Sequence, residues 1–594
     1  MSDQIKDPQL AGDGKIQEMV TAEPAVKGLG RSPNGDSVGS VAVTPPPARG
    51  IRGFFASHPI GFWFIFWGEF AERCSYYGMR AILVLYMEKQ LGFGEANAGT
   101  YSAFFFAACY FLPLLGGYLA DNFFGKYNII VGFSIPYILG HVILGIESPV
   151  YLAIALVLLA MGAGVIKPNI SALMGMTYDQ QRPGQEQLRS TAFAMFYLSI
   201  NIGATLGALV VPWLRTHYSY WLAFLFPAAL MVVAFLFFAL GKKHYAKEVI
   251  VRKKKTPEEF MLQWQVLGRI GGLFLLVMFF WAIFDQASIT WIFFGDKYMD
   301  LNVFGHQFEP DQIQALNPVL IVALLPGITY LWTVLARRGI TVRATDKMVV
   351  GFLLTALCMA VMAYAGFRAG PVEKTIAVQK IAKSDDSEEA QKKYQLEQAR
   401  ENTAAAIVNM IVNDFGVVDS KPLEEKLGEL GLLPFCQEAL NRRPAQPTVI
   451  AGTMGLMATP WATPPIAAVA SAIPPRTIVD YVRPENKVTV WWQMLAYLLL
   501  TVAEILISVT GLEMAFVAAP KSMKSFVTSM WLVTVGLANL FINAPVTRLY
   551  SRMNPGLYFA MLAVTLVAVA LAFIFVAKRF NRLVEMEKAA EASG

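Results

Sequence analysis

The stretch GEFAERCSYYGMR, from Gly68 to Arg80, places two acids and two arginines inside a hydrophobic run long enough to cross a membrane. Apolar segments flank it, PIGFWFIFW on one side and AILVLYM on the other. Ionised groups at bilayer depth cost roughly 2.5–3.5 kcal/mol each on insertion scales, so they persist where they pair, face a water-filled cavity or do chemistry. This stretch is therefore the first candidate for a functional site.

The charged and phenolic side chains of this stretch follow helical spacing. Positions i, i+3, i+4, i+7, i+8 and i+11 form one helix face, and here they are Glu69, Glu72, Arg73, Tyr76, Tyr77 and Arg80. One helix thus directs acid, base and phenol into the same space. A structural ion pair between Arg73 and either acid is the simpler interpretation, but it accounts for only two of the charges.

The composition indicates a polytopic, all-α membrane protein. The chain has 594 residues, of which 55% are hydrophobic and 15% charged, whereas soluble proteins are about a quarter charged. A transmembrane helix needs about 20 apolar residues. Segments of this kind predict twelve spans, at 60–88, 98–120, 127–146, 150–174, 190–214, 218–240, 268–294, 316–336, 347–367, 490–517, 526–548 and 556–577.

The distribution of charge predicts the orientation. The net charge of +6 alone would suggest a nucleic-acid partner, but the basic residues gather in alternate loops. They follow span 6 (Lys242, Lys243, Lys247 and 252–255), separate spans 8 and 9 (Arg337, Arg338, Arg343 and Lys347) and follow span 12. This positive-inside pattern predicts cytoplasmic termini, lipid as a partner and no nucleic acid. We expect a plasma membrane or bacterial inner membrane location.

The predicted spans divide into two six-helix halves, the layout of major facilitator transporters. An extracytoplasmic insert separates helices 9 and 10, and it is either a small accessory domain or lid, or a solvated and poorly structured segment. The predicted organisation is a disordered cytoplasmic tail (1–55), the first half (56–240), a cytoplasmic link (241–267), helices 7–9 (268–369), the insert (370–489), helices 10–12 (490–580) and a cytoplasmic tail (581–594).

A loop motif and the cysteines have structural interpretations. GGYLADNFFGK, from Gly116 to Lys126, joins spans 2 and 3 and resembles the cytoplasmic loop of the major facilitator superfamily. Glycine permits a tight turn and Asp121 can cap a helix, so we expect Asp121 to hold two helices together without touching substrate. The four cysteines are scattered and predict neither a disulfide framework nor a metal site.

Further polar residues lie inside apolar spans of both halves. The first half contributes Arg73, Arg80 and Lys167, with Pro168 next to the lysine, and the second half contributes Asp285 and Glu504. Facing halves of opposite charge suit a zwitterion, whose carboxylate would bind one half and whose ammonium would bind the other. The same charges can pair across the halves when substrate is absent, and protonation of an acid would break such a pair.

Five motifs in order resemble the signatures of the proton-dependent oligopeptide transporter family. They are Glu69-x-x-Glu72-Arg73-x-x-Tyr-Tyr-Gly, Gly-x-x-x-Lys167-Pro-Asn, Phe-Tyr-x-x-Ile-Asn201-x-Gly, Gln-x-Leu-Asn317-Pro, and Glu504 with the following ValThrGlyLeuGlu and AlaProLysSerMetLysSer. The resemblance covers nearly the whole chain except the first tail and the insert. It implies a major facilitator fold and proton-coupled import of di- and tripeptides, with protons as coupling ion and no cofactor.

The resemblance also implies roles for individual residues. Glu69, Glu72 and Arg73 would form the proton-coupling cluster with Lys167, Arg80 would pair with Asp285, and Lys167 would exchange partners with Glu504. Glu504 would receive the peptide amino terminus, while Arg80 and Lys167 would attract its carboxylate. The pocket would be lined by Tyr76, Tyr77, Tyr110, Asn201, Asn317 and Trp531, although ordinary helix packing explains the aromatic residues equally well. We expect the protein to act as a monomer.

Two departures from the family pattern and three alternatives bear on this interpretation. Cys74 replaces the usual phenylalanine after Glu-Arg, and span 2 lacks the histidine that animal relatives use in proton coupling. A transporter of the same fold for another anion such as nitrate, and a non-transporting peptide receptor that uses the insert as a sensor, are the main alternatives. An enzyme is disfavoured, because the sequence has neither a His-Glu-x-x-His nor a Gly-x-Ser-x-Gly motif.

Overall fold

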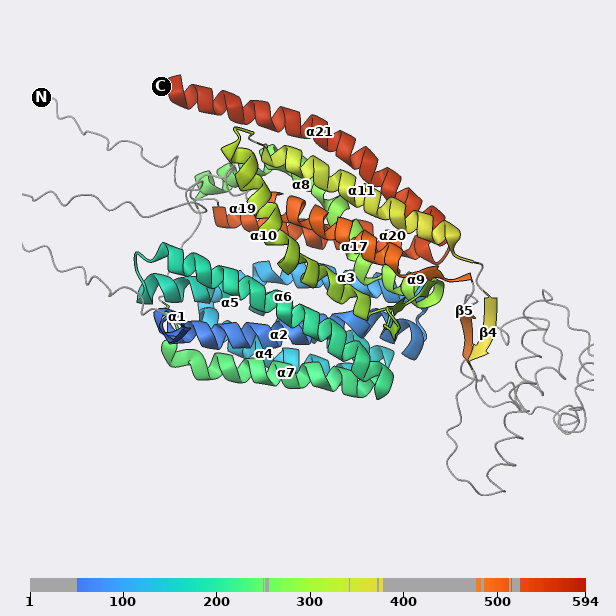
Figure 1. The fold of residues 1–594 in the computed structure, drawn as a ribbon. Helices are drawn as coiled ribbons and strands as arrows, with labels where there is room; N and C mark the ends of the chain where they lie inside the picture. Colours follow the sequence, from blue (N-terminus) through green and yellow to red (C-terminus); the bar gives the residue numbers. More distant parts are fainter. Residues whose placement is uncertain are drawn as a thin grey trace, which may run out of the picture.

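The structure is a computed structural model that describes residues 51–248, 250, 256–340, 342–370, 373–377, 477–481, 486–511, 514 and 524–593. Helices dominate these residues (Figure 1). The first half comprises α2 (Ile60–Leu85), α3 (Gly94–Leu119), α4 (Lys126–Leu144), α5 (Pro149–Gln181), α6 (Glu186–His217) and α7 (Tyr220–Leu240). The second half comprises α8 (Pro257–Phe284), α9 (Thr290–Tyr298), α10 (Leu316–Arg337), α11 (Ala344–Arg368), α17 (Trp491–Glu504), α19 (Lys524–Ala538), α20 (Ala544–Tyr550) and α21 (Pro555–Ser593).

The two halves lie side by side with their helices running in the same general direction (Figure 1). We call the end that carries the antiparallel strands β4 (Glu373–Ala377) and β5 (Thr477–Tyr481) the insert face. The opposite end carries the short helix α1 (Ile51–Ser57) and the end of α21, and we call it the terminal face. Two smaller strand pairs also occur, β1 (Met299–Asp300) with β6 (Val488–Thr489) and β2 (Asn302–Val303) with β3 (His306–Gln307).

The helices have the dimensions of membrane spans. Within the described residues, 11 helical segments are long and apolar enough to cross a bilayer, and the protein is an integral membrane protein. The first predicted span is not among the 11, although α2 is 26 residues long, because it carries Glu69, Glu72, Arg73 and Arg80. A helix of that length reaches about 39 Å, more than the roughly 30 Å of hydrocarbon. The charges that mark α2 as a functional element are therefore what reduce its hydropathy.

Several predicted boundaries differ from those of the structure. The link is shorter than 241–267, because η4 (Gly241–His244) continues α7 and α8 already begins at Pro257. Helix α21 continues to Ser593 through the predicted tail at 581–594, which is rich in the strong helix formers Ala, Glu, Lys and Arg. The predicted first tail overlaps α1, and residues 1–50 lie outside the described residues. So does most of the predicted insert, apart from the segments around β4, β5 and β6.

Three of the second-half helices are interrupted near their middle. The 3-10 turn η5 (Asp285–Ser288) separates α8 from α9, the π-helical turn η8 (Ile505–Val509) follows α17, and a second one, η10 (Asn539–Asn543), separates α19 from α20. Turns of these types inside longer helices often mark functional positions. Each of the three begins at or directly after a polar residue, namely Asp285, Glu504 and Asn539.

Glycines let α2 and α6 approach each other closely. A Cβ atom added to Gly207 would lie 2.3 Å from the Cys74 carbonyl oxygen and 2.8 Å from the Gly78 nitrogen. A Cβ atom on Gly78 would lie 2.5 Å from a methyl group of Val211. Because these contacts involve backbone atoms, a side chain at Gly207 cannot be accommodated by rotating its neighbours. This contact fixes the helix that carries the charged stretch.

We expect Gly207→Ala to lower the stability of the folded protein by about 1–3 kcal/mol, the usual cost of overpacking. The measurement is the thermal unfolding temperature of the purified protein in detergent. Gly117→Ala on α3 is the matched control, because no atom lies within 4 Å of its added Cβ and alanine favours helix. Equal unfolding temperatures for the two variants would show that α2 and α6 can separate without loss of stability.

Helix α1 is anchored to the terminal face by a buried histidine. His58 is 2% exposed, and its Nδ1 atom lies within hydrogen-bond distance of the Tyr178 hydroxyl on α5. Its ring stacks on Phe62, and Arg182 Nε donates to the carbonyl oxygen of Ser57 at 3.0 Å. Burial first, and then the positive charge of Arg182, lower the pKa of His58. The packing of α1 therefore favours the neutral imidazole.

Acidification should loosen α1. Below about pH 6.5 an exposed imidazole binds a proton more readily than the buried one does. The contribution of His58 to the stability of α1 is therefore complete above this pH and decreases as the pH falls toward the lower pKa of the buried ring. Hydrogen exchange of residues 51–57, corrected for its intrinsic pH dependence, should be faster at about pH 5.5 than at about pH 7.5. His58→Gln should abolish this difference. An unchanged difference in that variant would assign the effect to another group.

Candidate functional site

The charged stretch forms a buried cluster at the centre of the first half. Arg73 Nε lies 3.1 Å from Glu69 Oε1 and also forms an ion pair with Glu72. The Tyr137 hydroxyl, from α4, donates a hydrogen bond to Glu72 Oε1 at 3.2 Å. None of the three charged residues is more than 1% exposed. Two carboxylates thus share one guanidinium, and the cluster contains one more acid than base.

A second ion pair joins the halves. Arg80 Nη2, on α2, lies 2.6 Å from Asp285 Oδ1 at the 3-10 break between α8 and α9. The other carboxylate oxygen, Asp285 Oδ2, accepts a hydrogen bond from Asn539 Nδ2 at 2.7 Å. The guanidinium carbon of Arg80 also lies 4.0 Å from the centre of the Phe106 ring on α3. Asp285 is therefore held by the first half through one oxygen and by the second half through the other.

The second acid of the second half has a different environment. Glu504 is the last residue of α17, and its Oε2 atom accepts a hydrogen bond from Asn317 Nδ2 at 2.8 Å. The same amide lies 3.1 Å from Thr501 Oγ1. Asn317 is in the first turn of α10, so its amide ties α10 to α17. Among the residues that the structure describes, Glu504 forms no ion pair.

Lys167 lies on α5 in the first half, directly before Pro168. Its Nζ atom lies 5.6 Å from the centre of the Tyr110 ring on α3, within the range of a cation–π contact. Lys167 forms no ion pair with any other described residue, so its expected pairs with Glu504 and with the acidic cluster are not formed in this structure. An ion pair that changes partners exists in only part of a transport cycle. In this structure Glu504 accepts a hydrogen bond from Asn317 instead.

Some of the remaining predicted pocket residues contact the charged residues of the site, and others make only packing contacts. Tyr76 is buried between Arg73, whose guanidinium carbon lies 5.7 Å from its ring centre, and the Tyr77 ring at 5.3 Å. The Asn201 amide donates to the Tyr197 carbonyl of its own helix at 2.9 Å. Trp531 is 4% exposed and packs edge-on against Phe274. Asn201 and Trp531 thus have ordinary packing roles in this conformation, whereas Asn317 contacts a charged site residue.

A buried amide network extends from Asp285 and was not anticipated from the sequence. Asn543 Nδ2 donates to Asn539 Oδ1 at 2.7 Å, and the Gln286 amide binds Asn543 in turn. The Tyr558 hydroxyl donates to Gln286 Oε1 at 2.9 Å. These residues fix the side of Asp285 that faces away from Arg80. The sequence feature that could have indicated this network is a pair of asparagines four residues apart in an apolar span, because that spacing places both on one helix face.

Asp121 has a structural role in the loop between α3 and α4. Its Oδ1 atom lies 2.9 Å from Lys126 Nζ, so it ties the end of α3 to the start of α4 around Gly125, which has a φ of 75°. It does not cap α4, contrary to one of its expected functions. Glu248 of the link accepts the backbone N–H of Lys126 instead. The loop therefore also holds the link against the first half.

Ion pairs between the halves concentrate toward the insert face. Arg215, near the end of α6, binds Asp311 through two nitrogens at 3.1 Å each and Glu309 at 3.0 Å. Lys89 lies 2.6 Å from Asp296. Lys297 lies 2.9 Å from Glu95. Among the described residues no ion pair joins the two halves at the terminal face, where the ion pairs lie within one half or reach the link.

Two helical bundles joined by the ion pair of Arg80 with Asp285, with further buried charges on both sides, define a secondary transporter of the major facilitator class. The family model described as "POT family" matches residues 127–267, 248–385 and 449–574, which is more than half of the chain. The chain belongs to this family, the proton-dependent oligopeptide transporters. The resemblance noted in the sequence is thereby confirmed.

Curated relatives and solved structures agree with this assignment. The chain is 27% identical to solute carrier family 15 member 2 of Mus musculus, covering 84% of this chain and 87% of the relative. It is also 27% identical to peptide transporter family 1 of Drosophila melanogaster, covering 81% and 82%. A crystal structure of a peptide transporter POT in complex with sulfate superposes with a TM-score of 0.64 at 22% identity, covering 90% and 97%. This structural likeness confirms the fold.

Proposed function

We infer that this protein is a proton-coupled symporter that imports di- and tripeptides by alternating access. The observation that carries this proposal is the placement of opposite charges on facing halves, with Arg80 and Lys167 on the first and Glu504 on the second. Such an arrangement suits a zwitterionic backbone whatever its side chains. The name of the Drosophila relative, a peptide transporter, supports it, as does a solved family member in complex with 5-aminolevulinic acid, itself an amino acid.

The proton would act at the acidic cluster. Because Glu69 and Glu72 share Arg73, one bound proton would leave a single carboxylate paired with a single guanidinium. A group that gains or loses a proton in this way can bias two conformations only if it interacts differently with each of them. Lys167 would supply that difference, since it is unpaired with described acids here and could pair with an acid in another state. Protons are thus the coupling ion, and no cofactor is proposed.

The ion pairs suggest which side is closed. Ion pairs between the halves occur at the insert face, and none joins the halves at the terminal face among the described residues, so we propose that the structure is closed toward the insert face. The basic loops support a cytoplasmic terminal face. The protein would then be ready to release substrate inward, and Arg80 with Asp285 would separate when the insert face opens. We propose that a single chain completes this cycle.

Uptake of labelled dialanine into proteoliposomes tests the proposed function. With an inward proton gradient the wild-type protein should accumulate peptide, and Glu72→Gln should abolish accumulation because its neutral amide cannot exchange a proton. Glu186→Gln, on an exposed turn of α6 outside the cluster, is the matched control and should transport normally. If tight vesicles with wild-type protein accumulate no dialanine under any gradient, the peptide-symporter proposal is wrong. Gradient-driven nitrate uptake would then support the alternative.

A further inference from the structure

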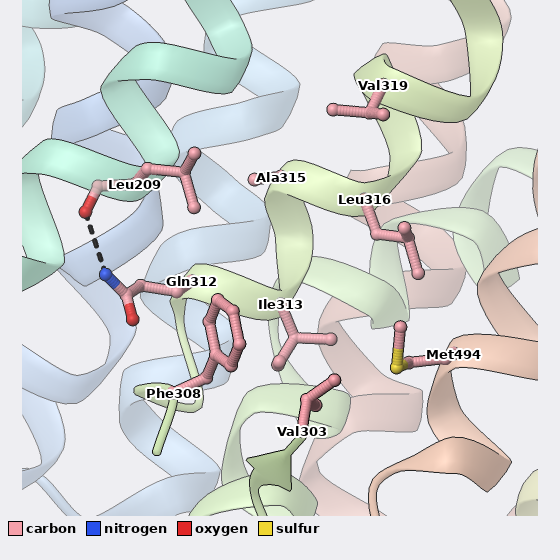
Figure 2. Close-up of a pocket in the computed structure, with 9 residues that line it drawn as sticks. All are labelled: Leu209, Val303, Phe308, Gln312, Ile313, Ala315, Leu316, Val319 and Met494. Atoms are coloured by element: carbon pink, nitrogen blue, oxygen red, sulfur yellow. Dashed lines mark hydrogen bonds between the residues drawn. The ribbon is translucent and has the colours of Figure 1, made fainter. Parts of the chain in front are cut away.

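An apolar pocket lies where α6 of the first half meets the second half, and none of the charged residues of the candidate site lines it. Leu209 forms one wall, and Val303, Phe308, Ile313, Leu316, Val319 and Met494 form most of the rest (Figure 2). The amide of Gln312 also borders it, but this group is turned to the side and donates to the Leu209 carbonyl at 2.9 Å (Figure 2). The pocket therefore presents hydrocarbon almost throughout, which does not suit a zwitterionic peptide.

The pocket extends from the loop residues Val303 and Phe308 into the membrane spans. The span that begins at Gln312 contains Val319 seven residues on, which places this residue about 10 Å from the insert-face end of the span. Met494 lies in the first turn of the span that begins at Trp491, and Leu209 lies eight residues before the end of α6. Leu209 and Val319 thus lie about 10 Å or more inside their spans, at the depth of the acyl chains in the leaflet at the insert face, whereas Met494 lies near the end of its span.

Exposed apolar side chains occur on all three helices that line the pocket. Leu206 on α6, Val322 on α10 and Leu495 on α17 are each at least 40% exposed. Phe304, which is 93% exposed, contacts the ring of Trp491 edge-on, and tryptophan is enriched at the membrane interface. These exposed apolar side chains favour an opening of the pocket toward the bilayer.

We propose that this pocket binds one acyl chain of a phospholipid from the leaflet at the insert face. Its volume of about 190 Å³ is smaller than the roughly 300–1,000 Å³ of pockets that enclose a whole small molecule. It accepts part of a molecule, and a phospholipid supplies such a part while its headgroup stays at the interface. The occupant contacts both halves, because Leu209 belongs to the first and the other lining residues to the second.

This position links the lipid to the conformational cycle. Separation of the halves at the insert face would remove the Leu209 wall and the hydrogen bond from Gln312. The lipid acyl chain therefore binds the closed arrangement better than the open one. A ligand with such a preference shifts the equilibrium toward the state that it favours. The acyl chain is thus a stabiliser of the closed insert face, independent of which substrate the protein carries.

Photolabelling in liposomes tests the proposal directly. The probe is phosphatidylcholine with a diazirine in the upper half of one acyl chain, and labelled residues are mapped by mass spectrometry. We expect labels on Leu209 and Met494, and we expect Val319→Trp, which fills the pocket, to abolish them. Val322→Trp is the matched control, since it adds the same ring to the same lipid-facing helix outside the pocket and should leave both labels in place.

Three outcomes would overturn the proposal. The first is unchanged labelling of Leu209 and Met494 in Val319→Trp, and the second is equal loss in the Val322→Trp control. The third is stronger labelling of these residues by a sterol diazirine in the same liposomes, which would assign the pocket to a sterol. Leu209→Phe fills the pocket from the other half, so it replaces Val319→Trp if that variant is not monodisperse, with the same expected loss of label on Met494.

Discussion

Replacing Arg73 with leucine should abolish gradient-driven uptake and lower thermal stability together. The substitution leaves Glu69 and Glu72 buried without their guanidinium, and removing one partner from a buried ion pair costs about 3–5 kcal/mol. The protein can avoid this cost only by holding protons on both acids. A cluster that keeps its protons cannot release them on the other side, so coupling is lost even in molecules that remain folded.

A double variant separates the two effects. Arg73→Leu combined with Glu72→Gln removes one of the unpaired charges, so it should recover part of the unfolding temperature but none of the uptake. Tyr137→Phe is the mild comparison, because it deletes one hydrogen bond to Glu72 and leaves all charges in place. Normal accumulation of dialanine by Arg73→Leu would show that the cluster is structural and that protons are coupled elsewhere.

The membrane architecture could be predicted from the sequence because its causes are local. Hydrophobic length sets each span, and the charges of α2 stand out against the apolar sequence around them. The pair between Arg80 and Asp285, implied by the family resemblance, is formed in the structure. Helical spacing was enough to place Glu69, Glu72 and Arg73 together, since they lie within four residues of one another.

Features that depend on the backbone or on distant contacts could not be predicted in the same way. The break at Asp285 contains neither proline nor glycine, and hydropathy continues across it, so the sequence showed one span from 268 to 294. The partner of Asp285 in its own half, Asn539, lies 254 residues away. The contact of Lys167 could not be predicted for a different reason. A residue that changes partners during a transport cycle has no single contact that its sequence could specify.

Glu504→Gln should weaken binding of peptides with a free amino terminus and little else. Glutamine keeps the shape of the side chain and an oxygen that can accept from Asn317, so the contact between α10 and α17 survives. What disappears is the charge that would attract the peptide ammonium. A hydrogen bond to a charged group contributes roughly 1.5–3 kcal/mol, which corresponds to about a 10- to 150-fold rise in the Kd for dialanine.

Comparison of two peptides identifies this role. N-acetyl-dialanine has no ammonium, so its weaker binding should be the same in Glu504→Gln as in the wild-type protein. Thr501→Val is the matched control, because it removes the other acceptor near the Asn317 amide without changing any charge, and it should leave the Kd for both peptides nearly unchanged. If Glu504→Gln weakens the binding of both peptides equally, Glu504 shapes the pocket and the peptide amino terminus binds elsewhere. If only dialanine is affected, the second half contributes the negative charge that a zwitterionic substrate requires.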